Sequence, residues 1–191
     1  MIEVELKYRL ADSVDVPKLL AAYGAHVAGE RTQRDVYFQH PVRDFRQTDE
    51  AFRIRCAGDT NVLTYKGPLL DRISKARQET EIGFESGAAA RGGMQQMLEQ
   101  LGFVPRPAVV KRRTEYEFHD QGRTVHACHD RVERLGEFLE LETLAPQDNW
   151  EPARDRLLEI AASLGLTASE RKSYLQLLDE ADAGEKHKDT K

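Results

Sequence analysis

Charged and apolar residues alternate strictly along the first segment of the chain. From position 2 to position 9, where the sequence reads Ile-Glu-Val-Glu-Leu-Lys-Tyr-Arg, even positions are apolar or aromatic and odd positions are charged. Successive side chains of a β-strand point to opposite faces of its sheet, so this segment predicts a strand with one apolar face and one fully charged face. The same division recurs in later segments, for example at residues 52–56 and 77–82. It is therefore a property of a whole sheet and not of one strand.

Segments with this period of two lie between a few helical segments. We expect helices at about residues 12–23, 88–100 and 149–165, with a glycine at or just after the end of each. A last helix is expected from residue 169. Eight strands connected by short turns are enough to close a small barrel. The predicted fold class is therefore α+β, an eight-stranded closed antiparallel β-barrel with helices packed outside. The predicted strands are residues 2–10, 34–39, 51–57, 61–67, 76–84, 109–119, 123–132 and 137–144.

Length and composition set the remaining limits. A chain of 191 residues that is 40% hydrophobic fits one domain, which we place at residues 1–180, followed by a polar tail at 181–191 that we expect to be disordered. The sequence has neither a membrane-length apolar run nor an apolar signal segment, so we expect a cytoplasmic protein without a membrane partner. The net charge of −5 argues against nucleic acid as a partner, because such binding favours clustered excess positive charge.

The charged strand faces have two possible settings. They either meet solvent or line a hydrated tunnel whose apolar outer side is covered by helices, and periodicity alone does not separate the two. Two features favour the tunnel. Glu-x-Glu and Arg-x-Arg repeats place like charges about 7 Å apart on one face, where a counter-ion or ligand would offset their repulsion. The predicted helices also need apolar surfaces to pack on, and the opposite strand faces supply them.

The types of charge on these faces indicate a ligand. Paired carboxylates at Glu3 and Glu5, and again at Glu140 and Glu142, are hard oxygen ligands that suit Mg²⁺ or Mn²⁺. Arginine and lysine suit phosphate oxygens, the first through a two-pronged contact and the second as a point charge. Together they predict a site for a metal ion and a phosphate compound.

The charged segments resemble, in order along the chain, those of the CYTH family, which is named for class IV adenylyl cyclases and thiamine triphosphatases. Members are also called triphosphate tunnel metalloenzymes. The opening Glu-Val-Glu-Leu-Lys at residues 3–7 matches the family signature Glu-x-Glu-x-Lys. Further matching segments, which extend the resemblance to about residue 178, are residues 34–38, 52–55, 64–68, 77–81, 111–113, 130–142 and 173–175.

The resemblance implies a role for individual residues. It implies Mg²⁺ or Mn²⁺ as cofactor and ATP or another triphosphate compound as ligand, while the parts of Asp35, Tyr37, Glu79 and Glu81 stay open. The implied catalytic residues are Glu3, Glu5, Lys7 and Asp130; the implied metal ligands are Glu3, Glu5, Glu140 and Glu142; the implied triphosphate-binding residues are Arg53, Arg55, Lys66, Arg77, Lys111 and Arg113.

Within the family, the Lys-Gly-Pro at residues 66–68 and the Leu-Gly-Glu-Phe at residues 135–138 resemble the class IV adenylyl cyclase branch. This likeness implies conversion of ATP to cyclic AMP and pyrophosphate. The triphosphatases of the family share the tunnel, so hydrolysis of inorganic or thiamine triphosphate is the alternative. A non-catalytic module that binds polyphosphate or nucleotide is the third option. A homodimer is left open.

Overall fold

The computed structural model describes residues 1–188 and contains one antiparallel sheet. Its strands follow the order β1-β9-β8-β7-β2-β3-β4-β5, and the short β6 pairs with β2 off this path. All eight predicted strands are present, so the antiparallel part of the predicted fold is confirmed. The strands are β1 (Ile2–Arg9), β2 (His26–Gln39), β3 (Ala51–Ala57), β4 (Thr60–Lys66), β5 (Glu79–Phe84), β6 (Val104–Pro105), β7 (Val109–Asp120), β8 (Arg123–Val132) and β9 (Gly136–Ala145).

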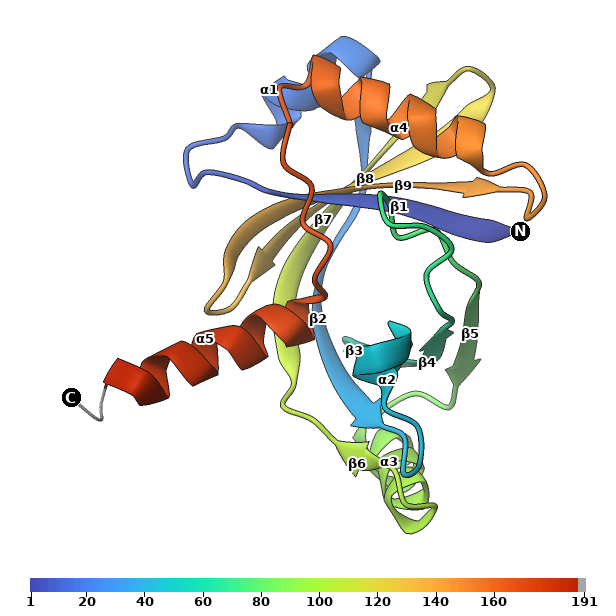
Figure 1. Ribbon diagram of the computed structural model, residues 1–191, viewed down its shortest axis with the longest axis vertical. Helices are drawn as coiled ribbons and strands as arrows, with labels where there is room; N and C mark the ends of the chain where they lie inside the picture. Colours follow the sequence, from blue (N-terminus) through green and yellow to red (C-terminus); the bar gives the residue numbers. More distant parts are fainter. Residues whose placement is uncertain (189–191) are drawn as a thin grey trace.

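Helices cover the sheet from several sides (Figure 1). The helices α1 and α4 lie together over β1, β8 and β9, whereas α3 lies beside β6 at the opposite end of the molecule. No helix within residues 1–188 is long and apolar enough to cross a membrane. The helices are α1 (Val16–Leu20), the 3₁₀-helix η1 (Ala21–Tyr23), α2 (Phe45–Thr48), α3 (Ala88–Gln100), α4 (Glu151–Ser163) and α5 (Tyr174–Lys188).

The prediction of a closed barrel is corrected, because β1 and β5 stand at the two ends of the strand order. In the part of the chain that the structure describes, their junction is a single bridge between Glu3 and Arg77, whose backbone N–H groups each donate to the other's carbonyl at 3.1 Å. Segment 67–78 leaves the sheet after β4 and does not form a strand. It contains Pro68, which has no N–H to offer a ladder. The strand predicted at residues 76–84 begins three residues later, at Glu79.

Strand β2 is much longer than predicted. It runs over 14 residues, pairing with β7 through residues 26–35 and with β3 through residues 33–37. The first seven residues are mostly exposed on both faces, so they carry no alternation of apolar and polar residues to reveal a strand. The first helix, in contrast, is shorter than predicted, because its N-cap is Asp15, whose side chain accepts a hydrogen bond from the Lys18 backbone at 3.1 Å.

The alternation along β1 divides the molecule into a core and a charged interior. The even-numbered residues of β1, such as Leu6 at 1% exposure, pack with Leu157 and Ile160 of α4 in the largest apolar cluster. Helix α5 packs Leu177 and Leu178 against Phe138 in a second cluster, and α3 contributes to a third. Burial of each large aliphatic side chain contributes about 1.5–3 kcal/mol. Since the apolar faces are packed under helices, the charged faces turn to the concave side of the sheet.

Helix α5 begins five residues later than predicted. The Gln176 backbone N–H donates to Ser173 Oγ at 3.2 Å, and the Ser173 N–H donates to Gln176 Oε1 at 2.7 Å. This reciprocal pair is a capping box, so the helix starts after Ser173. The helix then continues to Lys188, so residues 181–188 are helical where a disordered tail was expected. Alanine, glutamate and lysine in this segment favour helix. Residues 189–191 lie outside the described part of the chain.

Candidate metal and triphosphate site

The charged strand faces line one cavity of about 760 Å³. Every residue implied as a metal ligand or a triphosphate contact lines it. Of the residues implied as catalytic, Glu3, Glu5 and Lys7 line it as well. Asp130 does not, because it is 0% exposed and lies behind Lys111 and Arg113. The alternation seen in the sequence is therefore the alternation between core and cavity.

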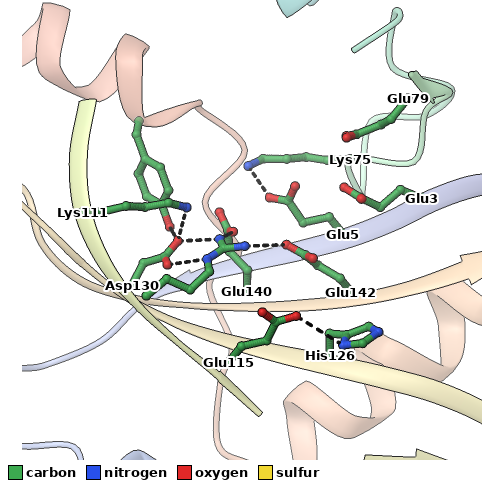
Figure 2. Close-up of polar contacts among 12 residues, drawn as sticks. Glu3, Glu5, Lys75, Glu79, Lys111, Glu115, His126, Asp130, Glu140 and Glu142 are labelled. Atoms are coloured by element: carbon green, nitrogen blue, oxygen red, sulfur yellow. Dashed lines mark hydrogen bonds and ion pairs between the residues drawn. The ribbon is translucent and has the colours of Figure 1, made fainter. Parts of the chain in front are cut away.

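Three carboxylates converge at one side of the cavity (Figure 2). Glu5 of β1 lies directly opposite Glu142 of β9, and Glu3 follows on the same face of β1. Oxygens of these three carboxylates, which we call the carboxylate triad, all lie within 4.8 Å of one another. Such a set of hard oxygen donors fits Mg²⁺ or Mn²⁺. Glu140, also implied as a metal ligand, lies outside the triad and pairs with Arg113.

Two members of the triad, Glu3 and Glu142, and the neighbouring Glu79 have pKa values that are shifted from their usual range. Burial raises the pKa of Glu142 well above its usual range, and the charges of Glu3 and Glu140 add to this rise against the opposing effect of Arg113. Burial likewise raises the pKa of Glu79 to about 7, and the charge of Glu3 adds to it although Lys66 opposes it. Burial acts in the same sense on Glu3, but Lys66 and a hydrogen bond from Glu79 lower its pKa to about 2. A cation bound among these acids would offset their mutual repulsion.

A first basic cluster is built around Asp35. Arg55 donates to it through two nitrogens at 2.8 Å each, in a two-pronged contact, and Arg53 Nη1 lies 3.3 Å from its second oxygen. The β2–β3 register places Asp35 directly opposite Arg55 and places Tyr37 opposite Arg53. The Tyr37 hydroxyl accepts a hydrogen bond from Arg53 at 3.4 Å. Asp35 and Tyr37, two of the four residues whose parts the sequence left open, thus orient the two arginines.

A second basic cluster is built around Asp130. This carboxylate accepts bonds from Lys111 Nζ at 2.7 Å, from Arg113 Nε at 2.7 Å and from Arg113 Nη2 at 2.6 Å. The Tyr174 hydroxyl donates a further bond at 2.9 Å. Burial acts to raise the pKa of Asp130, but Arg113 and Lys111 lower it overall. The ionised aspartate therefore fixes both cations at the wall of the cavity.

The remaining implied phosphate contacts come from β4 and the segment before β5. Lys66 Nζ lies 3.4 Å from Glu3 Oε1 and also pairs with Glu79. Arg77 donates to the Asp49 carbonyl at 3.0 Å. Glu79 therefore sits beside the triad (Figure 2), whereas the side chain of Glu81 is 51% exposed.

Lys75 is a cavity residue that the sequence analysis missed. Its ammonium lies 2.7 Å from Glu5 Oε1, and its side chain is almost fully buried (Figure 2). It precedes the predicted strand 76–84 and falls in the irregular segment 67–78. A signal was nevertheless present, because Lys75 has the same parity as Arg77 and Glu79, which face the cavity.

The start of α5 closes one end of the cavity. Lys7, 1% exposed, donates to the Lys172 carbonyl, and its ammonium lies 4.1 Å from the centre of the Tyr174 ring. Lys111 Nζ lies 5.0 Å from the same ring centre. Burial lowers the pKa of Lys7 well below its usual range, and the charge of Lys75 acts in the same direction.

Comparison with known proteins gives a consistent result. A model of the CYTH domain matches residues 1–174. A curated protein named "Putative adenylate cyclase" from Methanocaldococcus jannaschii is 38% identical over 180 residues, which are 93% of this chain and 98% of that protein. A solved structure from Pyrococcus horikoshii is 37% identical, with a TM-score of 0.80 and coverage of 94% of this chain and 99% of the other.

A more distant solved structure, from Hippeastrum, has a TM-score of 0.61 at 15% identity and covers 94% of this chain and 95% of that one. This likeness shows the fold alone. The family match over most of the chain agrees with the antiparallel sheet and its charged concave face. The chain therefore belongs to the CYTH domain family.

Proposed function

We propose that the protein converts ATP to cyclic AMP and pyrophosphate in this cavity with a divalent metal ion. The observation that carries the proposal is the convergence of the carboxylate triad with the two aspartate-centred basic clusters in one cavity. The family binds triphosphate compounds and depends on metal ions. The name of the 38% identical relative supports cyclisation as the reaction.

In this proposal the triad holds Mg²⁺ or Mn²⁺, which when bound supplies positive charge to phosphate oxygens and lowers the pKa of a nearby hydroxyl. Arg53, Arg55 and Arg113 orient the triphosphate by donating to its oxygens from fixed positions. The ribose 3′-hydroxyl releases its proton to solvent, its oxygen forms a bond to the α-phosphorus, and the bond from that phosphorus to the β-phosphate oxygen breaks. Pyrophosphate leaves, and its charge is balanced by the same basic residues.

Hydrolysis of a triphosphate is the second candidate, and one observation favours it. Of the residues that line the cavity, the aromatic ones are Tyr37 and Tyr174, and both already bind other residues of the wall. This lining offers little surface for stacking a purine. The Hippeastrum protein is described as having a dominant triphosphatase activity, so the fold by itself does not decide the reaction. The carboxylate triad counts against the third candidate, a binding module, because a simple phosphate clamp has little use for converging acids.

Product analysis separates the three candidates. The purified chain is incubated with ATP, and separately with inorganic triphosphate, in Mg²⁺ or Mn²⁺ from about pH 7 to about pH 10. A ribose hydroxyl is a very weak acid, so we expect cyclic AMP to increase with pH. A variant with both Glu3→Gln and Glu5→Gln serves as the inactive control. ADP or inorganic phosphate without cyclic AMP would identify a triphosphatase, and binding without turnover would identify the module.

A further inference from the structure

Lys75 places a positive charge directly on a member of the carboxylate triad. Its ammonium is 2.7 Å from Glu5 Oε1, and both side chains are almost completely removed from solvent. A carboxylate at this distance favours the charged form of the amine. Charges interact strongly at such a place because little water screens them.

The backbone of Lys75 is fixed, whereas its ammonium is at the end of a flexible stem. The Lys75 N–H donates to the Glu5 carbonyl at 2.9 Å, and the neighbouring Arg77 N–H donates to the Glu3 carbonyl at 3.1 Å. Asp71 Oδ1 accepts bonds from the Ile73 and Ser74 backbone at 3.0 and 2.8 Å, which holds the preceding turn. The four-carbon side chain can therefore redirect its charge within the cavity while the segment stays in place.

We propose that Lys75 is a counter-ion of Glu5 that competes with the divalent cation, and that the displaced ammonium then binds a phosphate oxygen of the substrate. The inference rests on the proposed metal and triphosphate function. An ammonium and a divalent cation at one carboxylate repel each other in a poorly screened site. Lysine also suits phosphate as a point charge, and Lys75 lines the same cavity as the basic clusters.

This arrangement couples the two binding events. A cation that displaces Lys75 from Glu5 makes the ammonium available to phosphate, and a phosphate that holds the ammonium lowers its competition for Glu5. Each ligand therefore increases the affinity for the other, as thermodynamic linkage requires. A purely structural salt bridge would behave differently, since neutralising it would loosen segment 67–78 and would not favour the cation.

The test measures Mn²⁺ binding alone, by electron paramagnetic resonance of the free ion, on the full chain. Lys75→Met should bind Mn²⁺ about tenfold more tightly or better, because one like charge is removed from the triad. Lys75→Arg keeps the charge and should stay near the wild type. Lys18→Met, on the exposed side of α1, is the matched control and should change nothing. Lys75→Gln provides a second neutral variant if the methionine variant does not fold.

The second measurement is the binding of inorganic triphosphate at saturating Mn²⁺. Lys75→Met should weaken it about tenfold, which corresponds to loss of one charge-assisted hydrogen bond. Unchanged or weaker Mn²⁺ affinity in both neutral variants would overturn the counter-ion role. Tighter Mn²⁺ binding with unchanged triphosphate affinity would overturn the transfer to phosphate.

A Glu5→Gln variant separates failure of this inference from failure of the proposed function. If Glu5→Gln weakens Mn²⁺ binding while the neutral Lys75 variants leave it unchanged, the metal site stands and the role of Lys75 is wrong. If Glu5→Gln leaves Mn²⁺ binding unchanged, the metal site and the inference both fail. In the double variant Lys75→Met with Glu5→Gln, the gain from Lys75→Met should disappear, because the competition acts through Glu5.

Discussion

The carboxylate triad and the aspartate-centred clusters occupy one cavity but balance their charges in opposite ways. Asp35 and Asp130 are 1% and 0% exposed, and each is bonded to two cations. The three glutamates of the triad instead lie close to one another, and each has one cation beside it, Lys66, Lys75 or Arg113. Burial and neighbouring acids raise the pKa of Glu142 well above its usual range. The pKa of Asp130 is shifted the other way, mainly because Arg113 and Lys111 oppose the effect of burial.

The difference separates residues that hold the site together from the residues that bind the metal ion in the proposed function. Neutralising a buried acid that has a full set of donors lowers the stability of the fold strongly, because it leaves buried cations without a negative partner. Acids that lie close to one another repel each other and so destabilise the fold, and a bound cation relieves this repulsion. The two regions should therefore respond with opposite signs when one carboxylate is neutralised.

The largest expected effect comes from Asp130→Asn. Loss of this charge leaves Lys111 and Arg113 buried without their shared partner, so the free energy of unfolding should fall by about 3–5 kcal/mol. Urea denaturation followed by circular dichroism measures this change. Asp120→Asn is the control, because Asp120 binds Arg156 through the same two-pronged geometry at a more exposed position and should cost much less. Equal losses in both variants would contradict the distinction.

Arg53→Ala should weaken inorganic triphosphate binding by about 1.5–3 kcal/mol, the range for hydrogen bonds to charged groups. Isothermal titration calorimetry at constant Mn²⁺ gives this value. The exposed Arg46 of α2, with a side chain 61% exposed, provides the control variant Arg46→Ala. The assignment of Arg53 to the triphosphate would be wrong if both variants bound alike.

The smallest expected effect compares two glutamates of the same strand. The pKa of Glu142 in the folded protein lies well above the ordinary 4.5, so the folded state retains a proton that the unfolded state loses. Stability should therefore fall as pH rises above about 4.5, and Glu142→Gln should raise it by about 1 kcal/mol at neutral pH. Denaturation without added metal, repeated across this pH range, measures both the gain and its pH dependence.

Glu140→Gln is the matched control for this experiment and should act with the opposite sign. Burial acts to raise the pKa of Glu140, but Arg113 and Lys111 lower it well below its usual range. Its contribution to stability is thus present at neutral pH and is lost as pH falls through the folded value. If Glu140→Gln and Glu142→Gln shifted the free energy of unfolding in the same direction, the charge balance described for β9 would be wrong.

Much of this arrangement could be predicted from the sequence. Strict alternation identified the strands and the charged concave face, because a period of two directly reports which side chains share a face. The prediction failed at residues 26–33 of β2, where the sequence has no such alternation. It also failed at segment 67–78, where an irregular backbone places Lys75 beside Glu5. The prediction of a closed barrel was wrong because of the same irregular segment. It joins β1 through one bridge, between Glu3 and Arg77, where a closed barrel would have a ladder between β5 and β1.

The partners of individual charges could not be predicted, because they depend on register. Glu140 and Glu142 share a face, lie two residues apart and both pair with Arg113, yet only Glu142 also joins Glu3 and Glu5. Asp35 meets Arg55 only because β2 and β3 pair with that particular stagger. The alternation excludes a one-residue shift of the ladder, because such a shift would turn the apolar side chains away from the core. A two-residue shift keeps every side chain on its face and changes every partner, so the alternation alone does not fix the alignment.

The pairing of β1 with β9 also has a consequence for the order of folding. Glu5 lies opposite Glu142, so the triad joins residues from distant parts of the chain. Contacts of such large sequence separation form late, because the entropy of closing the intervening loop must be overcome first. On the ribosome, β1 must wait for β9 with its apolar face uncovered, a state in which unpaired strands tend to aggregate. The carboxylate triad of the proposed metal site is therefore completed only when β1 pairs with β9, late in the assembly of the sheet.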